Sequence, residues 1–109
     1  MTVGEFAKQN TLNVLCMPEA EREITGCYIG DLLSWVMGNA REGDAWVTIM
    51  SNTNIVAVAT LTNVSCIILA ENVTLDEQAL NTAKENGINV LSTNLSAFNI
   101  ALLLKDTVV

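Results

Sequence analysis

Short polar stretches follow the apolar segments in the second half of this chain, and their side chains carry hydrogen-bonding chemistry. They are Ser51, Asn52 and Thr53, then Asn72, then Ser92 and Thr93. Hydroxyl and amide groups of this kind suit an anion or a hydrogen-bonding ligand, but they also cap helices and form turns. In open sheets of parallel strands, ligands bind beyond the carboxyl ends of the strands. These six residues are therefore the predicted ligand-binding residues, with capping as the alternative for each.

Four apolar segments are expected to form the strands that place these polar residues. They are residues 11–16, 45–50, 65–70 and 88–91. The third is a continuous apolar run without alternation, which is typical of a strand covered on both faces. The glycine-flanked stretch 26–30 is expected to be a turn or a loop. The predicted fold is α/β and three-layered, with a mostly parallel sheet of about four strands and helices on both faces.

Five helices are expected, and one of them is ambiguous from sequence alone. The predicted helices cover residues 2–9, 31–40, 54–62, 75–86 and 95–105. In residues 54–62, β-branched side chains favour a strand by propensity. A helix there would instead supply the right-handed crossover that parallel strands require. We predict the helix for this segment.

Local signals mark the ends of several predicted helices. Residues 74–77 (Thr-Leu-Asp-Glu) match a capping box, in which Thr74 accepts a bond from a backbone N–H and Glu77 reaches back. Gly87 is placed to take the left-handed conformation that ends the same helix. Asp31 is expected in the first turn of its helix, where a negative charge interacts favourably with the helix dipole.

The last predicted helix is apolar nearly all round, which a surface helix normally is not. Leu95, Phe98, Ala101 and Leu102 form one face, and Ile100, Leu103 and Leu104 make the remainder almost as apolar. We expect one face to pack on the sheet and part of the other to contact a second subunit. The prediction is a homodimer that Leu103→Lys weakens, unless Leu103 faces the sheet.

Several classes of chemistry are excluded by the composition. The chain has no histidine, so catalytic triads and imidazole bases are impossible. No lysine follows a glycine, so the phosphate-binding loop GxxxxGK[ST] is missing. Cys16, Cys27 and Cys66 form no CxxC pair, which argues against a zinc site or a disulfide framework, and Cys66 is expected to be a small buried hydrophobe. We assign no catalytic residue, and we expect no enzymatic activity.

Acidic residues are numerous but do not predict a metal site. Glu19, Glu21 and Glu23 follow Pro18 without a histidine or a calcium-loop glycine, so they are expected to form a solvated loop. The net charge is −7 and the five basic residues are scattered. Nucleic acid and anionic membranes are therefore not expected partners. No cofactor or metal is predicted.

Length and hydropathy predict one soluble domain over residues 1–109. No apolar run approaches the roughly 18 residues of a membrane helix. The N-terminal residues lack a basic segment followed by an apolar stretch, so a secretion signal is not indicated. We expect a cytoplasmic location.

Three phrases of the sequence resemble the DRTGG domain family over about residues 26–104. They are residues 26–33 (GCYIGDLL), 54–59 (NIVAVA) and 87–93 (GINVLST). Related domains precede the catalytic domain of HPr kinase/phosphorylase and occur in the regulatory region of CBS-containing pyrophosphatases. The chain looks like a stand-alone member. The Asp-Arg and Thr-Gly-Gly elements that name the family are replaced here by Ser51-Asn52 and Ala70-Glu71-Asn72, so their contacts cannot be transferred.

The resemblance implies a non-catalytic role and pairing through the domain. The kinase activity of relatives resides in a separate phosphate-loop domain. We predict a regulatory or small-ligand-binding homodimeric module, with a nucleotide among the possible ligands. The alternative is a protein-interaction or scaffolding subunit of a kinase or redox-enzyme system.

Overall fold

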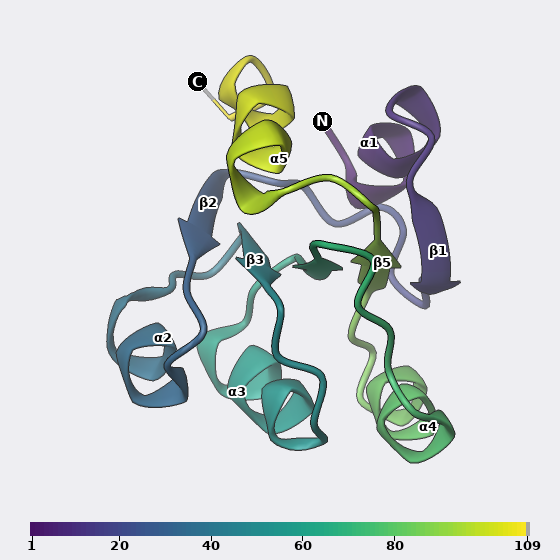
Figure 1. Ribbon diagram of the computed structural model, residues 1–109, viewed down its shortest axis with the longest axis vertical. Coiled ribbons are helices and arrows are strands. Elements are labelled where there is room, and N and C mark those ends of the chain that lie inside the picture. Colours follow the sequence, from purple (N-terminus) through teal and green to yellow (C-terminus); the bar gives the residue numbers. More distant parts are fainter. Residues whose placement is uncertain (109) are drawn as a thin grey trace.

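A five-stranded sheet forms the middle layer of the protein. The computed structural model describes residues 1–108. Its strands are β1 (Asn13–Cys16), β2 (Gly26–Ile29), β3 (Asp44–Thr48), β4 (Cys66–Leu69) and β5 (Val90–Ser92). Their order across the sheet is β1-β5-β4-β3-β2 (Figure 1). Strands β2 to β5 are parallel, and β1 pairs antiparallel with β5.

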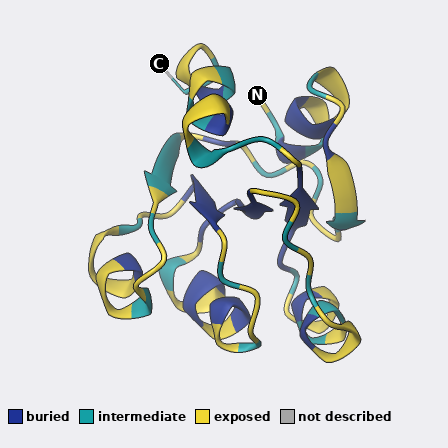
Figure 2. Cartoon of the chain, in the orientation of Figure 1, coloured by how far each residue is buried: buried dark blue, intermediate teal, exposed yellow. Residues whose placement is uncertain are grey.

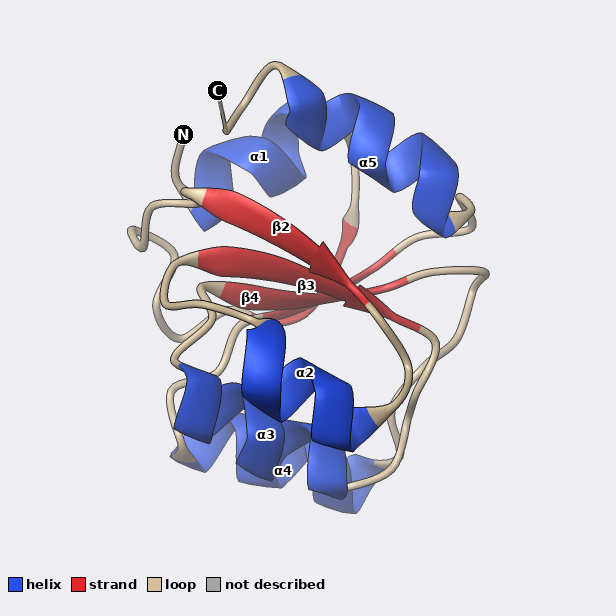
Figure 3. Cartoon of the chain, turned by 90° about the vertical axis from the view of Figure 1, so that its left-hand side faces the viewer, coloured by secondary structure: helices blue, strands red, loops and turns tan. Residues whose placement is uncertain are grey.

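Helices cover both faces of this sheet. They are α1 (Val3–Gln9), α2 (Leu33–Asn39), α3 (Asn54–Thr62), α4 (Glu77–Glu85) and α5 (Ala97–Lys105). Helices α2, α3 and α4 lie on one face, and α1 and α5 lie on the other (Figure 3). The predicted three-layer α/β class is confirmed. No helix within residues 1–108 has the length and apolarity needed to span a membrane.

The strand count differs from the prediction because residues 26–29 form a strand and not a turn. Gly26 and Gly30 made the stretch look like a turn in sequence. Between them, Cys27, Tyr28 and Ile29 have side chains that suit a strand, and their partners are Ala45, Trp46 and Val47 of β3. Residues 54–62, by contrast, form the predicted helix and connect β3 to β4.

The core divides into two clusters, one on each face of the sheet. Every residue of β3 and β4 is buried (Figure 2). On the side of α1 and α5, the cluster includes Phe6, Leu91 and Ile100. On the side of α2, α3 and α4, it includes Trp46 and Ile55. Covering both faces in this way gives the continuous apolar runs of the parallel strands.

The start of α4 differs from the predicted capping box. The helix begins at Glu77, and the Asp76 carboxylate, not Thr74, accepts a 2.7 Å hydrogen bond from the Ala79 N–H. Asp76 is three residues before Ala79, which is the spacing that an N-cap residue needs. Gly87, with φ of 70°, adopts the predicted left-handed conformation after the helix.

A capping box does occur at the start of α1. The Glu5 N–H donates to Thr2 Oγ1 at 3.1 Å, and the Thr2 N–H donates to Glu5 Oε1 at 2.9 Å. Hydrogen bonding to Thr2 lowers the pKa of the Glu5 carboxyl, because the bond stabilises its ionised form.

The helical periodicity groups Leu95, Phe98, Ala101 and Leu102 on one face of α5, but the helix buries another face. Ile100 and Leu104 are fully buried, while 68% of Phe98 and 50% of Leu102 are exposed. Leu103 packs against the core cluster. Leu103→Lys would therefore disturb the fold and does not test a subunit contact.

Candidate functional site

The carboxyl ends of β2, β3, β4 and β5 meet at one edge of the sheet, because these four strands are parallel. All six predicted ligand-binding residues lie in the segments that begin or continue from this edge. Figure 1 shows the loops from β3 to α3, from β4 to α4 and from β5 to α5 leaving the sheet there. We call this region the C-terminal edge.

The ends of β4 and β5 are joined by backbone hydrogen bonds. The Asn72 N–H donates to the Thr93 carbonyl at 2.8 Å, and the Glu71 N–H donates to the Leu95 carbonyl at 2.9 Å. Asn72 and Thr93, which are 21 positions apart in the chain, are thus brought into direct contact. Ser92 and Thr93 are only 5% and 6% exposed. Asn72, in contrast, is exposed.

The end of β3 forms a separate part of the C-terminal edge. Ser51 and Asn52 are exposed, and Thr53 is half-buried. The Asn52 Oδ1 accepts a 2.9 Å bond from the Asn54 N–H at the start of α3. Among residues 1–108, no hydrogen bond joins 51–53 to the corner formed by β4 and β5. The predicted residues therefore form two groups and not one continuous set.

Asp31 is a polar residue of this edge, although the sequence predicts it in the first turn of a helix. It lies before α2 and not in its first turn, because α2 begins at Leu33. Its Oδ1 accepts bonds from Thr48 Oγ1 at 2.7 Å and from the Ile49 N–H at 3.0 Å. The carboxylate thereby ties the end of β2 to the end of β3. Recognising residues 26–29 as a strand would have put Asp31 at a strand end.

The polar groups of the C-terminal edge largely satisfy one another. Thr93 Oγ1 accepts a 3.2 Å bond from the Leu95 N–H, in addition to the bonds of Asn52 and Asp31. Every buried side-chain nitrogen and oxygen of the described residues has a hydrogen-bond partner. Of the six predicted residues, Ser51, Asn52 and Asn72 have exposed side chains that remain available to a ligand. No lysine or arginine lies in residues 49–53, 70–73 or 92–95, so the edge favours a hydrogen-bonding ligand over a polyphosphate.

The three thiols are poor nucleophiles at neutral pH. Burial raises the pKa of Cys27 to about 11 and that of Cys66 to about 12, and it also raises the pKa of Cys16. Only the thiolate reacts readily. Cys66 is fully buried, which agrees with its predicted role as a small hydrophobe.

The acidic side chains of the described residues do not converge on a metal site. Within residues 1–108, no three His, Cys, Asp or Glu side chains are grouped closely enough to hold an ion. Glu19, Glu21 and Glu23 are exposed, and the Glu23 carboxylate pairs with the Met1 amino group at 2.9 Å.

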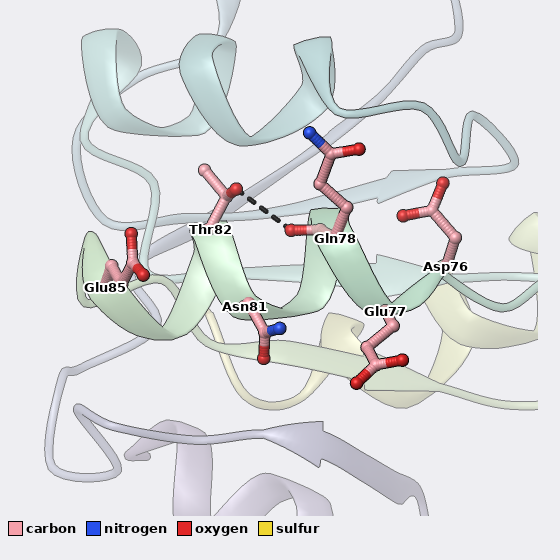
Figure 4. Close-up of a pocket in the computed structure, with 6 residues that line it drawn as sticks. All are labelled: Asp76, Glu77, Gln78, Asn81, Thr82 and Glu85. Carbon is pink, nitrogen blue, oxygen red and sulfur yellow. Dashed lines mark hydrogen bonds between the residues drawn. The ribbon is translucent and has the colours of Figure 1, made fainter.

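Two shallow hollows lie along α4. One is lined by Asp76, Glu77, Gln78, Asn81, Thr82 and Glu85, which all come from α4 and its N-cap (Figure 4). Within it, Thr82 Oγ1 donates to the Gln78 carbonyl at 2.9 Å. The other lies between α3 and α4, where Ala57, Leu61 and Asn86 line it and Thr53 forms part of its wall. Thr53 thus connects the C-terminal edge to an apolar groove.

Comparison with known proteins identifies the family. A protein-family model described as the DRTGG domain matches residues 13–107. The chain belongs to the DRTGG domain family. The fold of this DRTGG domain is similar to that in the crystal structure of the CBS and DRTGG domains of the regulatory region of Clostridium perfringens pyrophosphatase, complexed with the activator diadenosine tetraphosphate. A search of curated proteins found no match.

The structural similarity concerns the fold alone. The TM-score is 0.74 at 16% sequence identity, with 94% of this chain and 45% of the pyrophosphatase chain covered. This DRTGG domain therefore spans less than half of that regulatory region.

The backbone at Glu71 and Asn72 has an unusual conformation. Glu71 and Asn72, which the resemblance matches to the two glycines of Thr-Gly-Gly, have φ of 59° and 63°. Two successive left-handed residues are a conformation that glycine adopts without strain. The loop after β4 thus has a backbone conformation that glycine favours, while the exposed side chains of Glu71 and Asn72 occupy it here.

Proposed function

We propose that this DRTGG domain is a non-catalytic regulatory module that binds a small ligand at the C-terminal edge and works as a homodimer. The observation that carries this proposal is the corner between Asn72 and Thr93, where strand-end loops meet in a fold shared with a regulatory region. Exposed Ser51 and Asn52 lie on the same edge of the sheet. Ligands of open α/β sheets bind at such an edge.

The ligand class follows from the groups at the C-terminal edge. The related regulatory region was crystallised with a dinucleotide activator, which makes nucleotides and nucleosides the first ligands to test. The absence of basic side chains in these loops favours recognition of a base or a sugar by hydrogen bonds over recognition of phosphates. An uncharged nucleoside is therefore expected to bind at least as well as its triphosphate.

Thermal and chemical unfolding in the presence of nucleosides, nucleotides and other metabolites tests ligand binding. A ligand at 100 times its Kd raises the free energy of unfolding by about 2.7 kcal/mol. Asn72→Ala should abolish the shift, because it removes an exposed amide of the corner. Asn81→Ala, in an exposed position of α4, is the matched control and should leave the shift intact. A shift that survives in Asn72→Ala and in Ser51→Ala would place the ligand elsewhere.

The proposed homodimer rests on exposed apolar side chains. Phe98 and Leu102 of α5 are 68% and 50% exposed, which is unusual for a helix that also buries Ile100 and Leu104. Light scattering should give a mass near twice 11.7 kDa at micromolar concentration. A mass of one chain over the whole accessible concentration range would contradict the dimer.

The alternative function is that of a protein-interaction subunit. Large apolar side chains at the surface mark protein contacts, and in this alternative a heteromeric partner would cover Trp35 of α2 and the adjacent Leu32. Affinity purification from a native lysate separates the two functions: a stoichiometric heteromeric partner supports the subunit, and a ligand-dependent shift of the pure protein supports the module.

A further inference from the structure

The two edge strands of the sheet are protected to very different degrees. At one end, β1 has a register shift between Val14 and Cys16, and Pro18 follows it. Bulges and prolines are common devices by which edge strands avoid pairing with other chains. At the other end, β2 pairs with β3 in regular register and contains no proline and no charge. In the part of the chain that the structure describes, nothing pairs with the outer side of β2.

The helix beside this unprotected edge is also unusual. Residues 32–40, which include α2, contain no charged residue, and Val36 is the only residue of α2 that is buried. Leu32, Trp35 and Met37 are 61%, 62% and 51% exposed. A surface helix normally turns polar side chains to solvent. This one turns its largest apolar side chains outward.

These features lie on the same side of the molecule. Figure 3 shows β2 in front, with α2 below it and α5 above it. Ile29 at the end of β2 and Ile49 just after β3 are 48% and 49% exposed. Half of the ten large hydrophobic side chains that are exposed among the described residues lie in or next to α2 or at the ends of β2 and β3. We define the β2–α2 surface as Ile29, Leu32, Trp35, Met37 and Ile49.

We propose that a second copy of this chain docks on the β2–α2 surface, with the two β2 edges pairing antiparallel across a twofold axis. This inference rests on the proposed homodimer and places its contact on the β2–α2 surface instead of on Phe98 and Leu102 of α5. Pairing of this kind joins the two sheets into one and lays each α2 beside its counterpart. A twofold contact uses the same patch on both copies, so the patch must be complementary to itself.

The charge distribution favours a second copy as the occupant. Each chain carries a net charge of −7, so two copies repel each other wherever their carboxylates meet. Residues 26–40 contain a single charge, that of Asp31, whose carboxylate already accepts bonds from Thr48 and Ile49. A partner recognised by charge would require basic or acidic groups here. A neutral, self-complementary surface instead suits contact between identical acidic chains.

The exposed apolar area supplies more than half of what a standard dimer interface buries. An aromatic side chain has roughly 150–250 Å² to bury, so Trp35 alone leaves more than about 100 Å² exposed. Four aliphatic side chains that are each about half exposed bring the apolar total to about 500 Å² per copy. A standard interface buries about 800 Å² per partner, and the β2 backbone supplies a polar part of the rest. Trp is also the residue type most often found at the energetic centre of an interface.

Sedimentation and light scattering of single-residue variants test the β2–α2 surface. Trp35→Glu and Ile29→Lys should each raise the dissociation constant of the dimer by roughly tenfold or more, because they put charge in a desolvated contact. Leu61→Lys is the matched control, because Leu61 is 71% exposed on α3, away from this surface. It should leave the dimer unchanged. Phe98→Lys tests α5 as a separate dimer surface.

Hydrogen exchange of the unmodified protein provides a second measurement that does not depend on a variant folding. Backbone amides of β2 should exchange more slowly as protein concentration rises, since pairing protects them, while the amides of β1 should not change. Protection of β2 that is independent of concentration in a dimeric protein would overturn the proposal.

The outcomes also separate this inference from the homodimer itself. A protein that is monomeric at all concentrations overturns both. A dimer that Phe98→Lys dissociates, and that Trp35→Glu and Ile29→Lys leave intact, keeps the homodimer and overturns the β2–α2 surface. If the pure chain is monomeric and the β2–α2 surface binds only a different protein from a lysate, the proposed docking of a second copy is also overturned.

Discussion

Asn89 holds the backbone of Glu19 by two hydrogen bonds, although the two residues are 70 positions apart. The Glu19 N–H donates to Asn89 Oδ1 at 2.9 Å, and Asn89 Nδ2 donates to the Glu19 carbonyl at 2.8 Å. The same Nδ2 donates to the Ser65 carbonyl at 2.9 Å. Asn89 is 1% exposed. One buried amide thereby fixes the acidic loop of residues 17–23 to the start of the parallel strands.

The first prediction is that Asn89→Ala lowers the free energy of unfolding by about 2–4 kcal/mol, because it leaves buried backbone groups without partners. Asn89→Asp should cost at least as much, since a carboxylate accepts from Glu19 but cannot donate to the two carbonyls. Urea denaturation measures both. Asn81→Ala should change the value by less than about 0.5 kcal/mol. If Asn89→Ala and Asn81→Ala lower the free energy of unfolding equally, the hydrogen bonds of Asn89 do not stabilise the fold as proposed.

The second prediction is that stability falls as the pH rises above about 9. Burial raises the pKa of Cys27 to about 11 and that of Cys66 to about 12, from the ordinary value of 9.0. Between these values the unfolded chain loses thiol protons that the folded chain keeps, so unfolding becomes more favourable with increasing pH. The contribution is fully present below pH 9 and is lost toward pH 11–12.

The check for this prediction is the free energy of unfolding under reducing conditions near pH 7 and near pH 10. The double variant Cys27→Ser, Cys66→Ala should lose less stability between the two conditions than the unmodified chain. The difference between the two pH values is the relevant quantity, because Cys66→Ala also removes packing at both. An equal loss in both proteins would mean that other groups cause the alkaline decline.

The third prediction concerns the start of α4. Asp76→Ala should cost about 1 kcal/mol, since it removes the acceptor of the Ala79 N–H and a charge near the helix dipole. Asp76→Asn keeps the acceptor and should cost less. Thr74→Ala should have almost no effect on the chemical denaturation midpoint. A larger loss for Thr74→Ala than for Asp76→Ala would support the capping box expected from sequence.

These positions illustrate how far the sequence predicts the fold. Fully buried parallel strands such as β4 are evident, because a strand covered on both faces must be apolar throughout. The helix at residues 54–62 was predicted from a connection rule, against the β propensity of its own side chains. Strand β2 was missed because two glycines dominate a four-residue segment, and pairing with β3 overrides that local signal.

The sequence predicts at which edge of the sheet the polar residues lie, but not their burial or their hydrogen bonds. The topology rule places Asn72 and Ser92 at one edge of the sheet, and the structure joins Asn72 to Thr93. The structure also buries Ser92 and Thr93. No local pattern indicates this burial, because Ser92 lies in β5 between β1 and β4, and Thr93 is bonded to Asn72 of a distant loop. The hydrogen bond between Asp31 and Thr48 could not be predicted from the sequence either, since it requires β2 and β3 to be neighbours.

The fourth prediction tests the strained corner at Glu71. The φ of 59° places this residue in the left-handed region, which costs a residue with a Cβ about 1–2 kcal/mol relative to its usual conformations. Glycine relieves this strain but loses about 0.5–1 kcal/mol to its greater freedom in the unfolded chain. Glu71→Gly should therefore be neutral or raise the free energy of unfolding by up to about 1 kcal/mol.

Two controls separate backbone strain from the loss of the Glu71 side chain. Glu71→Ala removes the same carboxylate and keeps the strain, so it should be less stable than Glu71→Gly. Glu85→Gly puts glycine in the last turn of α4 and should lower stability by up to about 1 kcal/mol. If Glu71→Gly destabilises the protein as much as Glu85→Gly does, the corner is not strained. If the predicted order holds, the backbone of this loop favours glycine at position 71, and the Glu71 side chain is not needed to hold its shape.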